Sequence, residues 1–142
     1  MKSKYLFLIL IALFLIAAVS ASEEIKYSDE PKNISVEGIN FAVPEGFGQS
    51  KNLGDFAVLE SYGPTCLYTN ESGDKIVITV VSNLIGINID EIYHGGAVES
   101  TINGHDGWKY TQDGMHFFGY LHNGKGVLVG CTDEKRLPEI IL

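Results

Sequence analysis

Residues 107–132 read GWKYTQDGMHFFGYLHNGKGVLVGCT, and two dipeptides in this stretch decide the fold. Asp113-Gly114 and Asn123-Gly124 each lie between residues that alternate in polarity. Such dipeptides are typical of the two-residue turns that join neighbouring antiparallel strands. The stretch therefore predicts a three-stranded meander of residues 107–112, 115–122 and 125–132.

Two-residue turns also fix which side chains share a face of the meander. One face is nearly all apolar and carries Trp108, Tyr110, Met115, Phe117 and Leu128. The other face is mixed and carries Lys109, His116, Phe118, Tyr120, Val127, Val129 and Cys131. We expect a helix or a second sheet to cover the apolar face, and the mixed face to stay half exposed. The alternative is an aromatic platform that binds a glycan, a peptide or a partner surface. Its candidate contact residues, on whichever face is open, are Trp108, Tyr110, Phe118 and Tyr120.

Further strands are predicted upstream of the meander. Residues 75–82 contain the run IVITVV, which is apolar on both alternating faces, as in a central strand covered on both sides. Residues 65–69 are its expected hairpin partner. Other strands are predicted at 34–36, 39–43 and 56–62.

Two short helices are also expected, at 88–93 and within 133–142, with Asn88 and Thr132 as their N-caps. The predicted fold class is therefore α+β: a twisted antiparallel sheet, built of a meander and hairpins, with one or two short flanking helices.

Residues 1–21 have the order of a secretory signal peptide. Lys2 and Lys4 supply the positive start, residues 5–19 carry no charge, and Ser20-Ala21 completes a small-residue cleavage site. A helix over residues 5–19 would reach about 22 Å, short of the roughly 30 Å hydrocarbon core of a bilayer. We expect cleavage after Ala21. The alternative is an uncleaved leader that tethers the protein to the membrane.

We divide the chain into a signal peptide (1–21), a polar spacer (22–33) and a single α+β domain (34–142). The 142 residues include 10 basic and 18 acidic side chains, which gives a net charge of −8. Loss of Lys2 and Lys4 with the leader would leave the mature chain at −10. This acidity argues against a nucleic-acid partner.

Cys66 and Cys131 are the only cysteines. Disulfides persist in exported proteins, so we expect these two residues to form one structural bridge, with two buried free thiols as the alternative. Two Asn-x-Ser sequons, at Asn33 and Asn70, are candidate glycosylation sites.

The four histidines match no zinc signature, and we predict no metal site, no cofactor and no catalytic residue. His105 and Asp106 lie in a Gly-framed loop, where an imidazole beside a carboxylate would act as a general base. A hydrolase or metal-dependent enzyme centred on His105, Asp106 and His116 is therefore the alternative to a non-enzyme.

Two motifs, Phe41-Ala-Val-Pro-Glu-Gly-Phe47 and Ile102-Asn-Gly-His-Asp-Gly107, occur in an order that resembles a group of small exported archaeal proteins of unknown function. Their layout is similar to PsbP-like α+β domains, in which helices flank a twisted antiparallel sheet. The resemblance covers residues 34–142 and implies a fold but no catalytic residue. In this chain the long flanking helices are reduced to short candidates.

We expect a protein that is secreted or lies at the extracytoplasmic face of the cell membrane. Its predicted role is that of a non-catalytic binding module. The expected partner is an envelope or extracellular protein or a glycan, with membrane contact only through an uncleaved leader.

Overall fold

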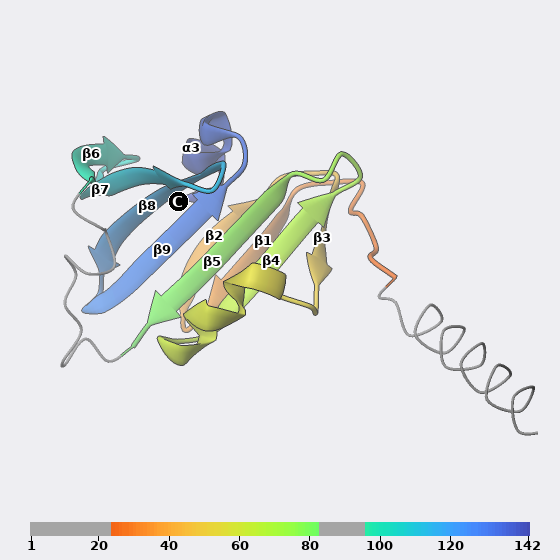
Figure 1. Ribbon diagram of the computed structural model, residues 1–142, viewed down its shortest axis with the longest axis horizontal. Helices are drawn as coiled ribbons and strands as arrows, with labels where there is room; N and C mark the ends of the chain where they lie inside the picture. Colours follow the sequence, from red (N-terminus) through yellow and green to blue (C-terminus); the bar gives the residue numbers. More distant parts are fainter. Residues whose placement is uncertain (1–23, 83–95) are drawn as a thin grey trace, which may run out of the picture.

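The computed structural model describes residues 24–82 and 96–142, which form two antiparallel sheets and short helical segments (Figure 1). The strands are β1 (Lys32–Val36), β2 (Ile39–Val43), β3 (Phe47–Ser50), β4 (Thr65–Asn70), β5 (Lys75–Val81), β6 (Val98–Ile102), β7 (His105–Gln112), β8 (Met115–His122) and β9 (Lys125–Cys131). The helical segments are the 3-10 helices η1 (Gly54–Ser61) and η2 (Glu134–Arg136) and the α-helix α3 (Leu137–Ile140). This architecture confirms the predicted α+β class.

Seven strands form the larger sheet, in the order β3-β4-β5-β9-β8-β7-β6. β5 lies inside it, and every residue of β5 after Lys75 is buried, because side chains pack on both of its faces. The predicted central strand and its hairpin with β4 are therefore confirmed. The hairpin β1–β2 forms the smaller sheet.

The predicted meander is β7-β8-β9, in the predicted register. Trp108 pairs with Gly119 and Gly119 with Leu128, so these positions share a face. The turn residues Asp113 and Asn123 have positive φ values of 53° and 52°, as the tight hairpin turns require. β7 begins at His105, two residues before the predicted start.

The mixed face of the meander is turned inward, and the expectation that it stays half exposed is wrong for its central residues. The β1–β2 hairpin and α3 cover this face, so that Phe118, Val129 and Cys131 are fully buried with Phe41 of β2. Ile141, directly after α3, bridges to Phe41. The large apolar side chains of β1–β2 pack against this face, which removes both surfaces from water. We call it the sealed face.

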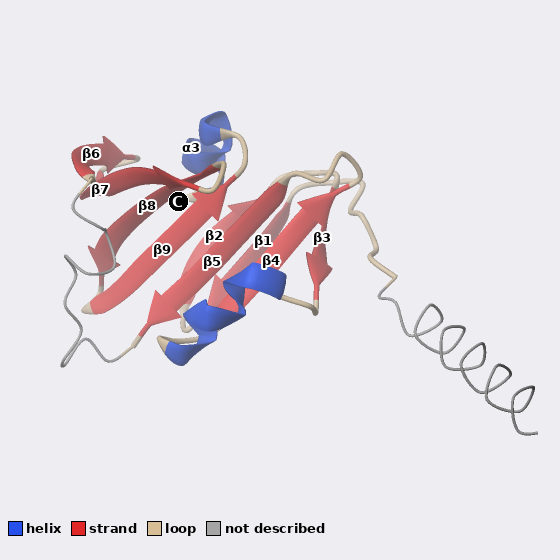
Figure 2. Ribbon diagram, viewed as in Figure 1, coloured by secondary structure: helices blue, strands red, loops and turns tan. Residues whose placement is uncertain are grey.

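Among the described residues, the opposite face of the sheet is covered by η1, which Figure 2 shows lying across the larger sheet, while β1 and β2 lie behind it. Residues 56–62 were expected as a strand, and this prediction is wrong. Leu53, Phe56 and Leu59 recur every third residue, which places them on one side of a 3-10 helix. These three side chains pack against the cluster that contains Phe117 and Leu128, so a 3-10 helix half-buries all three together.

Two strands were not predicted, namely β3 and β6. The turn before β7 is Asn103-Gly104, with φ values of 50° and 82°, and it closes a β6–β7 hairpin. It has the same chemistry as the two turns of the meander. The predicted C-terminal helix is present as η2 and α3, but its N-cap is Asp133, which accepts from the Lys135 amide. The predicted helix at 88–93 lies outside the described residues.

Candidate functional site

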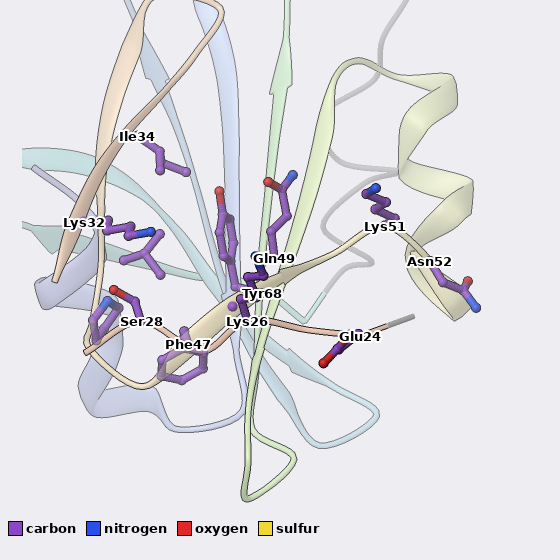
Figure 3. A pocket seen from close by; sticks show the side chains of 13 residues that line it. Glu24, Lys26, Ser28, Lys32, Ile34, Phe47, Gln49, Lys51, Asn52 and Tyr68 are labelled. Atoms are coloured by element: carbon purple, nitrogen blue, oxygen red, sulfur yellow. The ribbon is translucent and has the colours of Figure 1, made fainter. Parts of the chain in front are cut away.

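A hollow of about 970 Å³ lies on the sealed face, beside β3 at the edge of the larger sheet. Its walls come from the segment 24–31, β1, β2, β3 and β4 (Figure 3). Three lysines line it: Lys26, Lys32 and Lys51. We call it the lysine hollow.

The segment 24–31 forms one wall of the lysine hollow because it lies along β3. The Ser28 amide donates to the Phe47 carbonyl at 3.1 Å, and the Gly46 amide donates to the Ser28 carbonyl at 2.7 Å. A Cβ atom at Gly48 would collide with the Lys26 carbonyl, so only glycine allows this close approach. We expected residues 24–31 to be part of a flexible spacer. In the structure, Ser28 hydrogen-bonds this segment to the domain.

Three lysines and one acidic residue, Glu24, line this hollow, in a chain whose net charge is −8. Within residues 24–82 and 96–142 no ion pair is recorded for Lys26 or Lys32. Elsewhere, Lys109 pairs with Glu134, and Arg136 lies 3.6 Å from the Glu139 carboxylate. Lys26 and Lys32 therefore carry positive charge for which the described residues provide no ion-pair partner.

The floor of the lysine hollow is apolar and carries one hydroxyl. Ile34, Val43 and Phe47 supply the apolar surface, and Tyr68 stands between β3 and β5 with only 9% of its surface exposed. Gln49 is paired with Tyr68 in the strand register, and Figure 3 shows the two side chains extending in the same direction.

Burial, with a smaller contribution from nearby Cys66, raises the pKa of Tyr68 to about 12. The phenol therefore stays protonated at neutral pH. Among the described residues the structure records no hydrogen bond to its hydroxyl, which remains a donor for a ligand.

Arg136 packs against Phe47, a residue of the hollow. Its guanidinium lies 4.9 Å from the centre of the Phe47 ring, as in a cation–π contact. Lysine ammoniums, the Tyr68 hydroxyl and the Gln49 amide thus surround an apolar floor. This set of groups can hold a ligand that carries negative charge, hydroxyl groups and an apolar surface.

Two of the four predicted contact aromatics, Phe118 and Tyr120, are wrong because they belong to the core. Phe118 is fully buried and Tyr120 is 4% exposed, so neither can contact a partner. Trp108 is 39% exposed, and Tyr110 is half-buried on the same face.

Tyr110 lines a second hollow, of about 600 Å³, between η1 and the meander. Phe56, Leu59, Phe117 and Leu128 also line it. We call it the aromatic groove.

The structure does not bring His105, Asp106 and His116 together. Adjacent residues of a strand point to opposite faces, so the His105 and Asp106 side chains diverge. Asp106 accepts from Thr101 Oγ1 at 2.7 Å, whereas His116 lies at the other end of the meander, 3.8 Å from Glu134. No group of three His, Cys, Asp or Glu side chains suited to a metal occurs in the described part of the chain.

The predicted disulfide between Cys66 and Cys131 is wrong. Both cysteines are free, because β5 lies between β4 and β9. This places their strands about 10 Å apart, beyond the reach of a disulfide. Burial raises the pKa of the Cys66 thiol, and burial followed by the Asp133 carboxylate raises that of Cys131 to about 12, so both stay protonated at neutral pH.

The two sequons differ in their surroundings. Asn33 is exposed on β1. Asn70 closes the β4–β5 turn: its Nδ2 donates to the Asp74 carboxylate at 3.1 Å, and its Oδ1 accepts from the Asp74 amide at 2.8 Å. A glycan on Asn70 would be attached to the nitrogen that makes the first of these bonds, whereas no side-chain hydrogen bond of Asn33 is recorded among the described residues.

The predicted leader, residues 1–21, lies outside the described residues. In the part of the chain that the structure does describe, no helix has the length and apolar character needed to cross a membrane.

No protein family, curated protein or solved structure matches this chain. The resemblance to PsbP-like domains therefore stays a prediction from the sequence.

Sequence reasoning missed the lysine hollow because its lysines come from distant positions. Lys26 lies in the segment along β3, Lys32 begins β1, and Lys51 follows β3. No local pattern links them. The one available signal was the presence of lysines, in a strongly acidic chain, on both sides of the predicted β1–β2 hairpin.

Proposed function

We propose that this protein is an exported, non-catalytic binding domain that holds an acidic oligosaccharide in the lysine hollow. The observation that carries the proposal is the gathering of three lysines over an apolar floor in a protein of net charge −8. The unpaired charges of Lys26 and Lys32 favour an anion as the ligand. Acidic residues elsewhere on the surface do not cancel this attraction, because salt screens charges more than about 8 Å apart at physiological ionic strength.

A carbohydrate fits the lining better than a small inorganic anion. The hollow combines ammonium groups with amide and hydroxyl groups from Gln49, Asn52 and Ser28, and with apolar side chains. Sugar rings present hydroxyl groups on their edges and C–H groups on their faces, so both parts of the lining find a counterpart. The volume of about 970 Å³ also exceeds what one phosphate or sulfate would fill.

The argument for the location is the predicted leader. A signal peptide at residues 1–21 would deliver the domain to the extracytoplasmic side of the membrane, where envelope polysaccharides occur. Retention of the leader would tether the same domain to the membrane, and the mass of the mature N-terminus distinguishes the two cases.

The test is calorimetric titration of the purified protein with a trimer of galacturonic acid. We expect saturable binding that weakens as salt is added. The variant K26Q/K32Q should bind about tenfold more weakly or worse, because each lost ammonium removes a charge-assisted hydrogen bond. K75Q/K135Q removes the same net charge away from the hollow and should bind like the wild type.

Three results would contradict the proposal. The first is the absence of saturable binding, and the second is equal loss of affinity in both double variants. The third is equal binding of maltotriose, a neutral trimer, which would mean that the lysines are not used. Inorganic sulfate serves as the remaining comparison: if it binds as tightly as the uronate trimer, the hollow holds an anion but not a sugar.

A second candidate surface is favoured by the exposure of Trp108. Trp108 is 39% exposed and Leu121, on the same face, is 58% exposed, so this end of the sheet presents apolar surface. A protein partner is the class of ligand that suits such a surface. Capture of an envelope protein by the wild type, lost in W108A, would support this second role.

A further inference from the structure

Two histidine rings face each other across β7 and β8, at the far end of the sheet from the lysine hollow. His105 begins β7 and His122 ends β8, and the register that pairs Gly107 with Tyr120 places them opposite one another. Their ring centroids are 5.2 Å apart, with an interplanar angle of 77°. Both side chains are half-buried.

The protein fixes the orientation of the His105 ring. Its Nε2 lies 2.7 Å from the main-chain oxygen of Leu142. Because that oxygen can only accept, Nε2 carries the proton and donates, which leaves the lone pair of Nδ1 available. Histidines that bind metals usually donate their second ring N–H to a carbonyl or carboxylate in this way.

The separation of the two rings suits a shared metal ion. In a tetrahedral site the metal–nitrogen distance is about 2.0–2.1 Å, and two imidazoles on one ion then have their centroids about 5 Å apart. The observed 5.2 Å agrees with that geometry.

Two other side chains lie close to the histidine pair. The Tyr120 ring lies 4.6 Å from the His105 ring, and burial raises the pKa of Tyr120 to about 12, so it is an uncharged wall. Lys125 is paired with His122 in the register, but its ammonium donates to the Glu37 carbonyl at 2.6 Å. Among the described residues no third His, Cys, Asp or Glu completes a ligand set.

We propose that His105 and His122 together bind a divalent transition-metal ion of the zinc and copper class. Two imidazole nitrogens hold the ion, and water fills its remaining positions. Such a site binds its metal reversibly and leaves coordination positions open to a further ligand. It is independent of the lysine hollow, because the two sites share no residue.

The test uses Zn²⁺ alone, added to the purified protein and followed by calorimetry and by the NMR signals of the imidazole rings. We expect one equivalent to bind with micromolar affinity and to shift the signals of His105 and His122. Zn²⁺ should also raise the melting temperature of the wild type, since it binds the folded state. Mg²⁺, which prefers oxygen ligands, should do neither.

His122→Ala and, separately, His122→Gln should each weaken Zn²⁺ binding at least about tenfold. His116→Ala is the matched control, since it removes an imidazole from the same strand at its other end, and it should bind Zn²⁺ like the wild type. Circular dichroism checks that each variant folds.

The proposal is overturned if folded wild type takes up no Zn²⁺ below millimolar concentration. It is also overturned if the affinity survives in both His122 variants, or if His116→Ala loses as much as they do.

Discussion

The lysine hollow and the aromatic groove lie on opposite faces of one seven-stranded sheet, and they differ in what covers them. On the sealed face, β1–β2 and α3 cover the central residues, and the hollow lies at the β3 edge. On the other face, η1 is the covering element within the described part of the chain, and the groove runs beside it. The sealed face therefore contributes most of the hydrophobic core and has a charged site at its edge. The other face contributes a smaller apolar cluster.

The largest expected effect is a difference in stability between adjacent phenylalanines on the two faces. Phe118→Ala should lower the free energy of unfolding by roughly 3–5 kcal/mol, because the fully buried ring leaves a cavity between two rigid layers. Phe117 stacks on half-buried Tyr110, with 5.0 Å between the ring centroids, and the η1 side chains that cover it are only partly buried. Phe117→Ala should therefore cost less, at most about 3 kcal/mol.

Urea unfolding of both variants provides the measurement. Phe118→Leu keeps the comparison possible if the alanine variant does not fold. An equal or larger loss at Phe117 would show that the η1 layer contributes as much as the sealed face.

A smaller loss in the free energy of unfolding is expected at alkaline pH, and it should come from two tyrosines of the sealed face. Burial raises the pKa of Tyr68 and Tyr120 to about 12, above the ordinary value near 10. Between these values the unfolded chain has released the two protons and the folded chain still holds them. The unfolded state therefore binds fewer protons, and the free energy of unfolding falls as pH rises through this window.

The variant Y68F/Y120F has no phenol to titrate at these positions, so its stability should fall less steeply between about pH 10 and 12. The measurement is the free energy of unfolding in urea at several pH values. Identical slopes for the variant and the wild type would show that the two phenols are not held in their protonated form by the fold.

The smallest effect is expected at the exposed end of the groove face. Trp108→Ala should change the free energy of unfolding by less than about 1 kcal/mol, because much of the ring is already in contact with water. The same variant should bind the uronate trimer like the wild type. A loss comparable to that of Phe118→Ala would instead identify Trp108 as a core residue.

The sequence predicted the meander and its register well, because Asp113-Gly114 and Asn123-Gly124 leave the backbone few alternatives. It failed at 56–62, where Phe56-Ala-Val-Leu59 is apolar enough for a strand but is spaced for a 3-10 helix on the sheet. We placed Asn103-Gly104 in a loop and did not predict a hairpin there, although this turn has the same chemistry as the other two.

Which face of the sheet is covered, and which side chains form a site, depends on tertiary structure. Alternation along a strand separates two sets of side chains but does not say which set the β1–β2 hairpin will cover. The disulfide prediction failed because the order of strands, which places β5 between the cysteines, cannot be read from cysteine count. The pairing of His105 with His122 was within reach, since it follows when the meander register is continued by two residues.

The most direct test of the account is a map of backbone amide NMR shifts during titration with the galacturonic acid trimer. We expect saturable shifts at the lysine hollow, in residues 26–34, 43–52 and around Tyr68, and none along the aromatic groove. Shifts centred on the groove residues Phe56, Leu59 and Tyr110, or no saturable shifts at all, would contradict it.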